Sequence, residues 1–272
     1  MEGMSPSREA LQRSEGRQLF GLDPGGYEAG RPDYPSFVYD SLRKRCGLAP
    51  GTRVLEVGPG TGIVTRRLLT AGARVVAVEP DPSLASYLKE AMSSEDLQII
   101  GASFEEAEID AGAFDLAVAA TSFHWVDQEV GLRKLGQVIR PGGWIALWWT
   151  LFRDPNHPDP FSTEVEELLG PTTRGAFDEP GRPPFQLDHD HRQRDLARWA
   201  QVEDMTCELV SWTCVLTPAQ TRALYASMAT VIRRPNTEQH ELLDQLERLA
   251  ADAFDGRVER NFVTSLYTGR RP

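Results

Sequence analysis

The amino-acid sequence predicts an α/β protein with a doubly wound, mostly parallel β-sheet. Between residues 53 and 150, short β-rich runs alternate with longer amphipathic stretches, which is typical of successive βαβ units. A glycine-rich turn at 58–62 follows the first run directly, and a carboxylate, Glu79, ends the second. Segment 53–150 is therefore expected to form the core of the sheet.

The expected elements of this core are short and regular. Asp81 and Pro82 suit the N-cap and the first position of a helix, so the helix after the second strand has a clear start. The expected strands are 54–57, 74–78, 97–100, 114–119 and 144–149. The expected helices are 61–71, 82–92 and one that begins near 127, and a turn at 141–143 precedes the last strand. The side chains expected to face the core from the first helix are those of Ile63, Val64, Leu68 and Leu69.

The pattern changes after residue 150. Segment 154–194 is rich in Pro, Asp, Arg and His and is periodic only around 161–169, so a cap insertion is expected at 151–200. The strands and helices expected in 201–272 are 206–216, 218–233, 237–254 and 258–267. The first 36 residues have little apolar content at their start and are expected to form a lid. The whole chain, 1–272, is expected to be one elaborated domain.

Composition limits the class of protein. The chain is 40% hydrophobic and 25% charged, an ordinary globular balance. No run approaches the roughly 20 apolar residues that span a bilayer, and the polar start does not resemble a secretion signal. Cys46, Cys207 and Cys214 are too scattered for a disulfide framework or a CxxC zinc site. We therefore expect a cytoplasmic protein without a membrane partner.

The net charge of −11 bears on the partners. A protein that binds nucleic acid through phosphate contacts is usually basic, at least locally. We therefore expect no nucleic-acid partner and a small-molecule substrate, with a monomer and a homodimer both open.

The glycine turn is the main chemical motif. Its glycines permit a tight turn and close approach of a ligand, and the amides at the start of the next helix can hold a polar group. Glu79, at the end of the second strand, is spaced to bind ribose hydroxyls. Together these features indicate an adenosine-bearing ligand at the carboxyl ends of the strands.

Two details distinguish the ligand from a dinucleotide. In the dinucleotide motif G-x-G-x-x-G the third glycine falls one position later than Gly62 does here, and Ile63 occupies its place. Glu56 puts a negative charge beside the turn, which would repel a pyrophosphate. The same charge suits an amino group and a sulfonium, both of which S-adenosyl-methionine carries.

Several motifs together resemble class I S-adenosyl-methionine-dependent methyltransferases. They are VLEVGPGTG at 54–62, EPD at 79–81, FDL at 114–116 and RPGG at 140–143. Three more resemble the small-molecule (type 11, trans-aconitate-like) subgroup, namely YEAGRPDYP at 27–35, SFE at 103–105 and SFHWVD at 122–127. The close match spans about 27–150, and the later part resembles the family only in its order of elements. The resemblance implies a seven-stranded sheet whose antiparallel edge hairpin is formed by 206–216 and 258–267.

The resemblance also implies a cofactor site. The glycine turn would hold the methionine part, Glu79 the ribose, and the residues after the third strand the adenine, largely through backbone amides. The residues after the fourth strand would also line the methionine part. The residues expected to bind S-adenosyl-methionine, and S-adenosyl-homocysteine as the product, are Glu56, Gly58, Gly60, Gly62, Glu79, Pro80, Ser103, Phe104, Ala120 and Thr121.

The reaction expected is an in-line displacement at the sulfonium methyl, for which an enzyme contributes mainly alignment and exclusion of water. His124 is the candidate base for an oxygen or nitrogen nucleophile, because a histidine titrates near neutral pH. The alternative is that His124 forms part of the pocket wall or binds the cofactor. The residues expected to contact the acceptor are Tyr27, Arg31, Tyr34, Trp125 and Tyr225. For Tyr225, ordinary helix packing is also open.

Other functions stay open from the sequence. A carboxylate acceptor is a close variant of the expected reaction, and carbon methylation is a further one. Methylation of a nucleobase or protein, a catalytically silent adenosyl-binding module and a dinucleotide-dependent oxidoreductase are the alternatives. The tract DHDH at 188–191 contains metal-binding residue types but no further spaced ligand, so no metal is expected. Trp144, Trp148 and Trp149 are expected to pack within the sheet.

Overall fold

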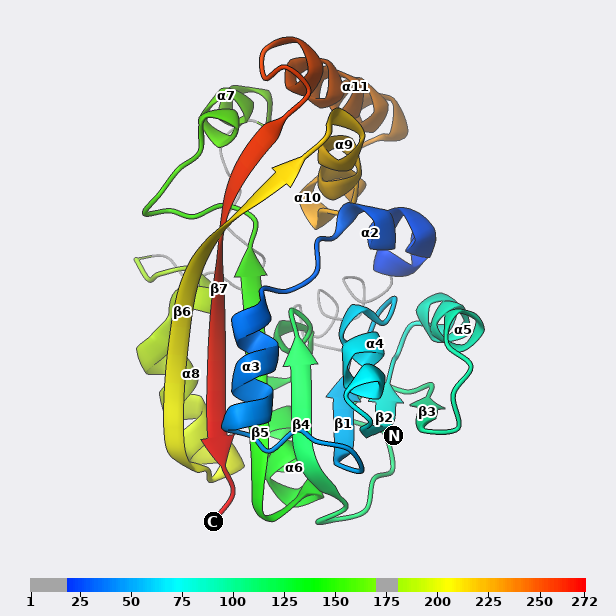
Figure 1. Cartoon of the computed structure of the whole chain (residues 1–272), viewed down its shortest axis with the longest axis vertical. Coiled ribbons are helices and arrows are strands. Elements are labelled where there is room, and N and C mark those ends of the chain that lie inside the picture. Colours follow the sequence, from blue (N-terminus) through cyan, green and yellow to red (C-terminus); the bar gives the residue numbers. More distant parts are fainter. Residues whose placement is uncertain (1–18, 170–180) are drawn as a thin grey trace, which may run out of the picture.

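The computed structural model describes residues 19–169 and 181–272. Its centre is a seven-stranded sheet with the order β3-β2-β1-β4-β5-β7-β6 (Figure 1). The strands are β1 (Arg53–Val57), β2 (Arg74–Val78), β3 (Leu97–Ile100), β4 (Phe114–Ala120), β5 (Ile139–Leu151), β6 (Glu203–Leu216) and β7 (Val258–Arg270). The predicted α/β fold with a doubly wound sheet is confirmed.

Helices cover both faces of the sheet and one end of it. The helices of the first half are α2 (Pro24–Gly30), α3 (Ser36–Lys44), α4 (Ile63–Thr70), α5 (Pro82–Ala91) and α6 (Gln128–Val138). Those of the second half are α7 (Pro160–Leu169), α8 (His189–Asp195), α9 (Pro218–Ala226), α10 (Ala229–Ile232) and α11 (Asn236–Asp252). The short 3-10 and π turns are η1 (Phe20–Leu22), η2 (Phe123–Trp125), η3 (Phe185–Leu187) and η4 (Leu196–Ala200).

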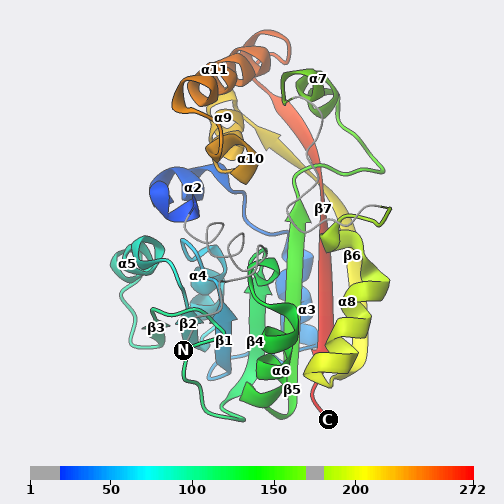
Figure 2. The same ribbon diagram turned by 180° about the vertical axis from the view of Figure 1, so that it is seen from behind.

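The sheet is parallel from β3 to β5 and antiparallel at its other edge. β1 pairs in parallel with β2 and β4, whereas β7 runs antiparallel to both β5 and β6. Helices α3 and α4 lie on one face, and α6 and α8 lie on the other (Figures 1 and 2). This arrangement confirms the predicted antiparallel edge hairpin and leaves the carboxyl ends of the parallel strands on one side.

The two faces of the sheet have separate cores because successive strand residues point to opposite faces. Trp148 packs with Val38 and Leu42 of α3, whereas its neighbour Trp149 packs with Leu132 and other side chains on the α6 side. Both tryptophans are almost fully buried, so they pack within the sheet as predicted.

A third group of helices lies above the carboxyl ends of the parallel strands. Helices α7, α9, α10 and α11 gather around the ends of β6 and β7, and α2 lies between them and the tips of β1 and β4 (Figure 1). Helix α2 packs closely on α9, where a Cβ at Gly30 would lie 2.2 Å from the carbonyl oxygen of Ala223. The N-terminal segment and the C-terminal helices therefore meet over the sheet.

The helix starts follow local chemistry. Oδ1 of Asp81 accepts hydrogen bonds from the amides of Ser83 (2.8 Å) and Leu84 (3.1 Å), and Pro82 is the first residue of α5, as predicted. The first helix, in contrast, begins at Ile63 and not at residue 61, because Gly62 has φ 89° and cannot be helical. Its buried side chains include Val64 and Leu68, while Ile63 is only half-buried.

Two other boundaries were predicted wrongly. Residues 141–143 do not form a separate turn, since Gly142 and Gly143 exchange backbone hydrogen bonds with Arg271 and extend β5 back to Ile139. The single helix expected at 218–233 is broken at Met228, whose backbone is extended. The break has a tertiary cause, because Nη2 of Arg31 donates to the carbonyl oxygen of Ser227 at 2.7 Å.

The cap insertion is more regular than its composition indicated. It contains α7 and α8, and its residues 170–180 lie outside the described part of the chain, as do residues 1–18 of the expected lid. Within the described ranges, no helix is both long enough and apolar enough to cross a membrane.

Candidate functional site

The glycine turn joins β1 to α4 at the carboxyl end of the sheet. A Cβ on Gly60, where φ is 58°, would meet no atom within 4 Å, so the backbone there borders open space. Beside it, the hydroxyl of Thr61 is buried and has no hydrogen-bond partner among the described residues. A buried hydroxyl without a partner is costly, so both observations fit a ligand lying against this turn.

Glu79 is fixed beside the turn by two backbone amides. Its Oε2 accepts from the amide of Gly60 at 3.0 Å, and its Oε1 accepts from the amide of Asp81 at 3.0 Å. Pro80 lies between the two acids and leads into α5. The structure therefore brings the end of β2 to the glycine turn, as the spacing of these residues along the chain predicts.

Glu56 lies under the turn, 1% exposed. Thr65 of α4 donates to its Oε2 at 2.7 Å. Burial, with a smaller contribution from the nearby charge of Glu79, raises the pKa of Glu56 to about 7. Two buried carboxylates beside the turn favour a positively charged ligand.

The end of β3 leads into a compact turn at Ser103. The hydroxyl of Ser103 donates to Oε2 of Glu106 at 2.6 Å. Phe104 is 2% exposed, and its ring packs on that of Phe123 with the centroids 6.3 Å apart. Its ring therefore belongs to the core, and what Phe104 offers a ligand is its backbone.

The backbone at the end of β4 is strained, and a hydrogen bond joins it to the N-terminal segment. Thr121, directly after Ala120, has φ 52°, an uncommon value for a β-branched residue. Tyr34 donates to its hydroxyl at 3.0 Å. Burial raises the pKa of Tyr34, so the phenol stays protonated as a donor. Tyr34 thus ties the N-terminal segment to the strand end.

Ser122 is a site residue that the sequence reasoning missed. Its hydroxyl donates to the carbonyl oxygen of Val57 at 2.5 Å, and a Cβ on Gly58 would lie 2.7 Å from its Cβ. Ser122 therefore clamps the first residue of the glycine turn against the end of β4. Ser122 belongs to the motif SFHWVD, but the sequence has no pattern that identifies Val57 as the hydrogen-bond partner of this serine.

His124 and Trp125 form a short 3-10 turn after β4. The indole N–H of Trp149 donates to Nδ1 of His124 at 3.1 Å. Burial, assisted by the charge of Arg31, lowers the pKa of His124 to about 3. The ring is therefore neutral near pH 7, and its proton lies on Nε2 because Nδ1 accepts from the indole.

Aromatic rings gather around Arg31 near this turn. The guanidinium of Arg31 lies 5.0 Å from the ring centre of Tyr27 and 4.4 Å from that of Phe152. Its Nε is buried and, within the described ranges, has no hydrogen-bond partner. The ring of Phe20 links Tyr27 to Trp125, at centroid distances of 5.4 and 6.0 Å. Segments from both halves of the chain therefore meet at Arg31.

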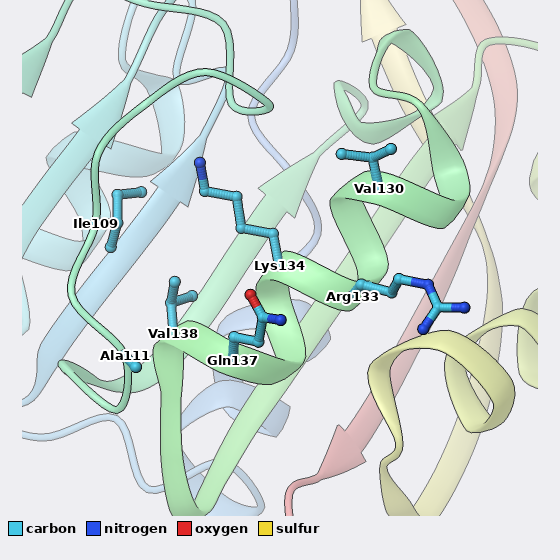
Figure 3. Close-up of a pocket in the computed structure, with 7 residues that line it drawn as sticks. All are labelled: Ile109, Ala111, Val130, Arg133, Lys134, Gln137 and Val138. Carbon is cyan, nitrogen blue, oxygen red and sulfur yellow. The ribbon is translucent and has the colours of Figure 1, made fainter.

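Tyr225, which was expected to contact the acceptor, does not belong to the group of aromatic rings around Arg31. It is 3% exposed, and its hydroxyl accepts from Nη1 of Arg260 at 3.0 Å in the core of the upper helices. A hollow of about 420 Å³ also lies elsewhere, beside α6 (Figure 3). None of the residues expected to bind cofactor or acceptor lines that hollow.

The two histidines of the tract at 188–191 contact neighbouring side chains. Nδ1 of His189 lies 2.7 Å from the hydroxyl of Tyr267, and Nε2 of His191 lies 3.5 Å from a carboxylate oxygen of Asp195. In the part of the chain that the structure describes, no three His, Cys, Asp or Glu side chains are placed to hold a metal ion.

Comparison with known proteins identifies the family. A family model described as a methyltransferase domain matches residues 55–147. An uncharacterized methyltransferase of Mycobacterium tuberculosis is 32% identical over 233 residues, which cover 85% of this chain and 85% of the relative. The chain belongs to the class I S-adenosyl-methionine-dependent methyltransferases. It is an enzyme, and its cofactor is S-adenosyl-methionine.

Solved structures share the fold. A putative methyltransferase from an antibiotic biosynthesis pathway of Anabaena variabilis has a TM-score of 0.60 at 14% identity, over 87% of this chain and 98% of that one. An N-methyltransferase of Haemonchus contortus, in complex with phosphomonomethylethanolamine and S-adenosylhomocysteine, has a TM-score of 0.57 at 13% identity. That match covers 98% of this chain but only 61% of the worm enzyme.

Proposed function

We propose that this methyltransferase transfers a methyl group to an oxygen or nitrogen atom of a small metabolite. The observation that carries the proposal is the covered position of Arg31, between Tyr27 of α2 and Phe152 after β5. A buried donor beneath a helical cover suits a compact acceptor with an oxygen atom, and it suits a long polymer less well. The Anabaena protein is a putative methyltransferase from an antibiotic biosynthesis pathway, which is a reason to look first among natural products.

We place the cofactor along the carboxyl ends of β1 to β4. Glu79 would bind the ribose hydroxyls, with Pro80 shaping the turn beside it. Gly58, Gly60 and Gly62 would follow the methionine part, and Glu56 would balance its positive charge. Ser103 and the backbone of Phe104 would meet the adenine, and Ala120 and Thr121 would close the methionine end. The order of the strand ends and the open space at Gly60 support this placement.

The acceptor would lie between the cofactor and the upper helices. The unpartnered Nε of Arg31 would donate to an acceptor oxygen, because a buried donor gains most when it is paired. Tyr27, Tyr34 and Trp125 would form the walls. For Tyr225 we propose an indirect role, since its hydroxyl is engaged by Arg260 and supports the helices above the site.

The structure changes the role that we propose for His124. A general base needs a free lone pair, and the lone pair of Nδ1 already accepts from Trp149. With its proton on Nε2, the neutral ring is a hydrogen-bond donor that positions its neighbours. An acceptor whose lone pair is available at neutral pH, such as a carboxylate or an uncharged amine, needs no base from this residue.

We propose that the chain works as one domain with a lid and a cap. The lid, within residues 1–36, would close through Glu28, which binds Nη2 of Arg66 at 2.9 Å and the hydroxyl of Tyr87 at 2.5 Å. The cap at 151–200 and the helices of 201–272 would shape the acceptor pocket above the core at 53–150. We also propose action in the cytoplasm, on the argument from cysteine usage.

The test is a transfer assay with S-adenosyl-methionine carrying a labelled methyl group. Panels of carboxylic acids, phenols and amines are compared with ribosomal RNA and protein extracts. Label in a small molecule, lost in Arg31→Leu while that variant still binds S-adenosyl-homocysteine, supports the proposal. Label in RNA or protein only would replace it with macromolecule methylation. Tight cofactor binding with no transfer to any panel would favour the silent module.

A further inference from the structure

Lys134 lies on α6, on the face of the sheet opposite to α3 (Figures 1 and 2). Its ammonium group donates to the carbonyl oxygen of Glu105 at 3.3 Å and also to that of Ala107. It lies 5.2 Å from the centre of the Phe104 ring. All three contacts are with the single turn that follows β3.

The turn has short-range bonds of its own, and it is also tied to the start of α6, where the amide of Asp127 donates to Oε1 of Glu105 at 3.0 Å. The amides of Glu106 and Ala107 both donate to the carbonyl oxygen of Ser103, at 3.1 and 2.9 Å. These short-range bonds fix the shape of the turn, whereas its place relative to the sheet depends on its contacts with α6 and with Phe123. Lys134 adds to these contacts, because it joins two backbone carbonyl groups of the turn to a helix packed on the core.

The lysine is not an ordinary solvated surface group. Burial lowers its pKa, and the negative charge of Glu105 opposes that effect. A partly desolvated ammonium is stable where it has several acceptors, and charge-assisted hydrogen bonds to carbonyl oxygens are the stronger kind. The contacts of Lys134 therefore make a defined link between α6 and the turn.

The neighbouring Arg133 provides a matched comparison. Both side chains line the hollow beside α6, and Figure 3 shows them leaving the helix in opposite directions. The guanidinium of Arg133 binds Glu129 of its own helix at 3.1 Å and lies 4.4 Å from the ring centre of Trp199. Arg133 thus shares the helix and the hollow with Lys134 but has none of its contacts to the turn.

We infer that Lys134 is a positioning residue for the adenine end of the cofactor. It holds the turn at residues 103–107 so that Ser103 and the backbone of Phe104 meet the adenine in a fixed place. The inference rests on the placement of the cofactor proposed above. It assigns Lys134 no contact with the cofactor and no part in the methyl transfer itself.

The first test is calorimetric titration of S-adenosyl-homocysteine into the full-length protein and three variants. Lys134→Met should raise the Kd about tenfold, since the turn then loses its lysine contacts with α6 and must be ordered further on binding. Arg133→Met should stay within about twofold of the wild type, and Lys134→Arg, which keeps the donors, should recover part of the loss. Thermal unfolding without ligand checks that the two methionine variants are comparably folded.

A second measurement uses the unaltered protein, in case Lys134→Met does not fold. The chain has three lysines, Lys44, Lys89 and Lys134, so acylation of each amine can be followed by mass spectrometry. Saturating S-adenosyl-homocysteine should slow acylation at Lys134 and leave Lys44, whose side chain is 80% exposed, unchanged.

The outcomes separate two failures. If the wild type does not bind S-adenosyl-homocysteine, the cofactor placement itself fails. If the wild type binds it but Lys134→Met binds as tightly as Arg133→Met, or if the ligand leaves Lys134 acylation unchanged, the role inferred for Lys134 is wrong.

Discussion

The carboxylate of Glu79 accepts a hydrogen bond from the amide of Gly60 at 3.0 Å, although the two residues lie on different strand ends. Glu79 therefore has two possible functions, binding the ribose and holding the glycine turn. Both are lost together in Glu79→Ala, for which we expect S-adenosyl-homocysteine to bind about 100-fold more weakly. Calorimetry measures this change.

Two comparison variants make that experiment specific. Glu79→Gln keeps an oxygen that can accept from Gly60, so it should bind better than Glu79→Ala but worse than the wild type. Glu95→Ala removes an exposed carboxylate before β3 and should leave the affinity unchanged. Wild-type affinity in Glu79→Ala would contradict the placement of the ribose.

Cofactor affinity should depend on pH through Glu56. Its pKa of about 7 in the ligand-free protein means that much of it is protonated below neutral pH. A positively charged ligand prefers the ionised form, so the affinity should rise between about pH 6 and pH 8. Glu56→Gln should remove this dependence. An equally steep pH dependence in Glu56→Gln would assign it to another group.

The ionisation of Glu56 should also lower the stability of the folded protein as pH rises. The pKa of Glu56 is raised from 4.5 to about 7 on folding. Its contribution to the stability of the folded protein is therefore fully present below about pH 4.5 and is lost as pH rises toward 7. Without ligand, Glu56→Gln should therefore be more stable than the wild type at pH 8, with a difference that shrinks toward pH 5. Thermal midpoints across this range test the prediction.

His124 should remain neutral over the physiological range. Because its pKa is lowered to about 3, nitrogen NMR of the histidines should show a neutral ring with the proton on Nε2 from pH 8 down to pH 5. The lowered pKa also means that its contribution to stability is lost as pH falls from 6.5 toward 3, since the unfolded chain binds the proton more readily. Protonation with a midpoint near 6.5 would contradict the neutral donor and restore the base.

The upper helices should depend on a buried ion pair. Nε of Arg260 donates to Oδ1 of Asp159 at 3.1 Å, and both side chains are 2% exposed. Arg260→Leu leaves the carboxylate buried without its cation and should cost about 3–5 kcal/mol in urea unfolding. Arg257→Ala breaks an exposed pair with Glu259 and should cost less than about 1 kcal/mol. A similar small loss in both variants would mean that the buried pair is not needed for stability.

The features predicted well from the sequence are those with short-range causes. The glycine turn, Glu79 and the Asp81 cap lie within about 25 residues of one another, and spacing along the chain was enough to bring them together. Alternating strands and helices likewise predicted that β1 to β5 run parallel to one another.

The features predicted poorly depend on distant partners. The helix expected at 218–233 breaks where Arg31 donates a hydrogen bond to the carbonyl oxygen of Ser227. Residues 141–143 belong to β5 because Gly142 and Gly143 exchange backbone hydrogen bonds with Arg271. The clamp by Ser122 and the turn contacts of Lys134 also join segments that no periodicity connects. His124 is a candidate base by residue type, whereas its protonation depends on burial and on the charge of Arg31, and its tautomer depends on Trp149.

The most direct test of the account is calorimetric titration of the purified protein with S-adenosyl-methionine, S-adenosyl-homocysteine and NAD, repeated with Glu79→Ala. The account predicts saturable binding of the first two ligands, none of NAD, and a large loss of affinity in the variant. Binding of NAD alone, or cofactor binding that Glu79→Ala leaves intact, would contradict it.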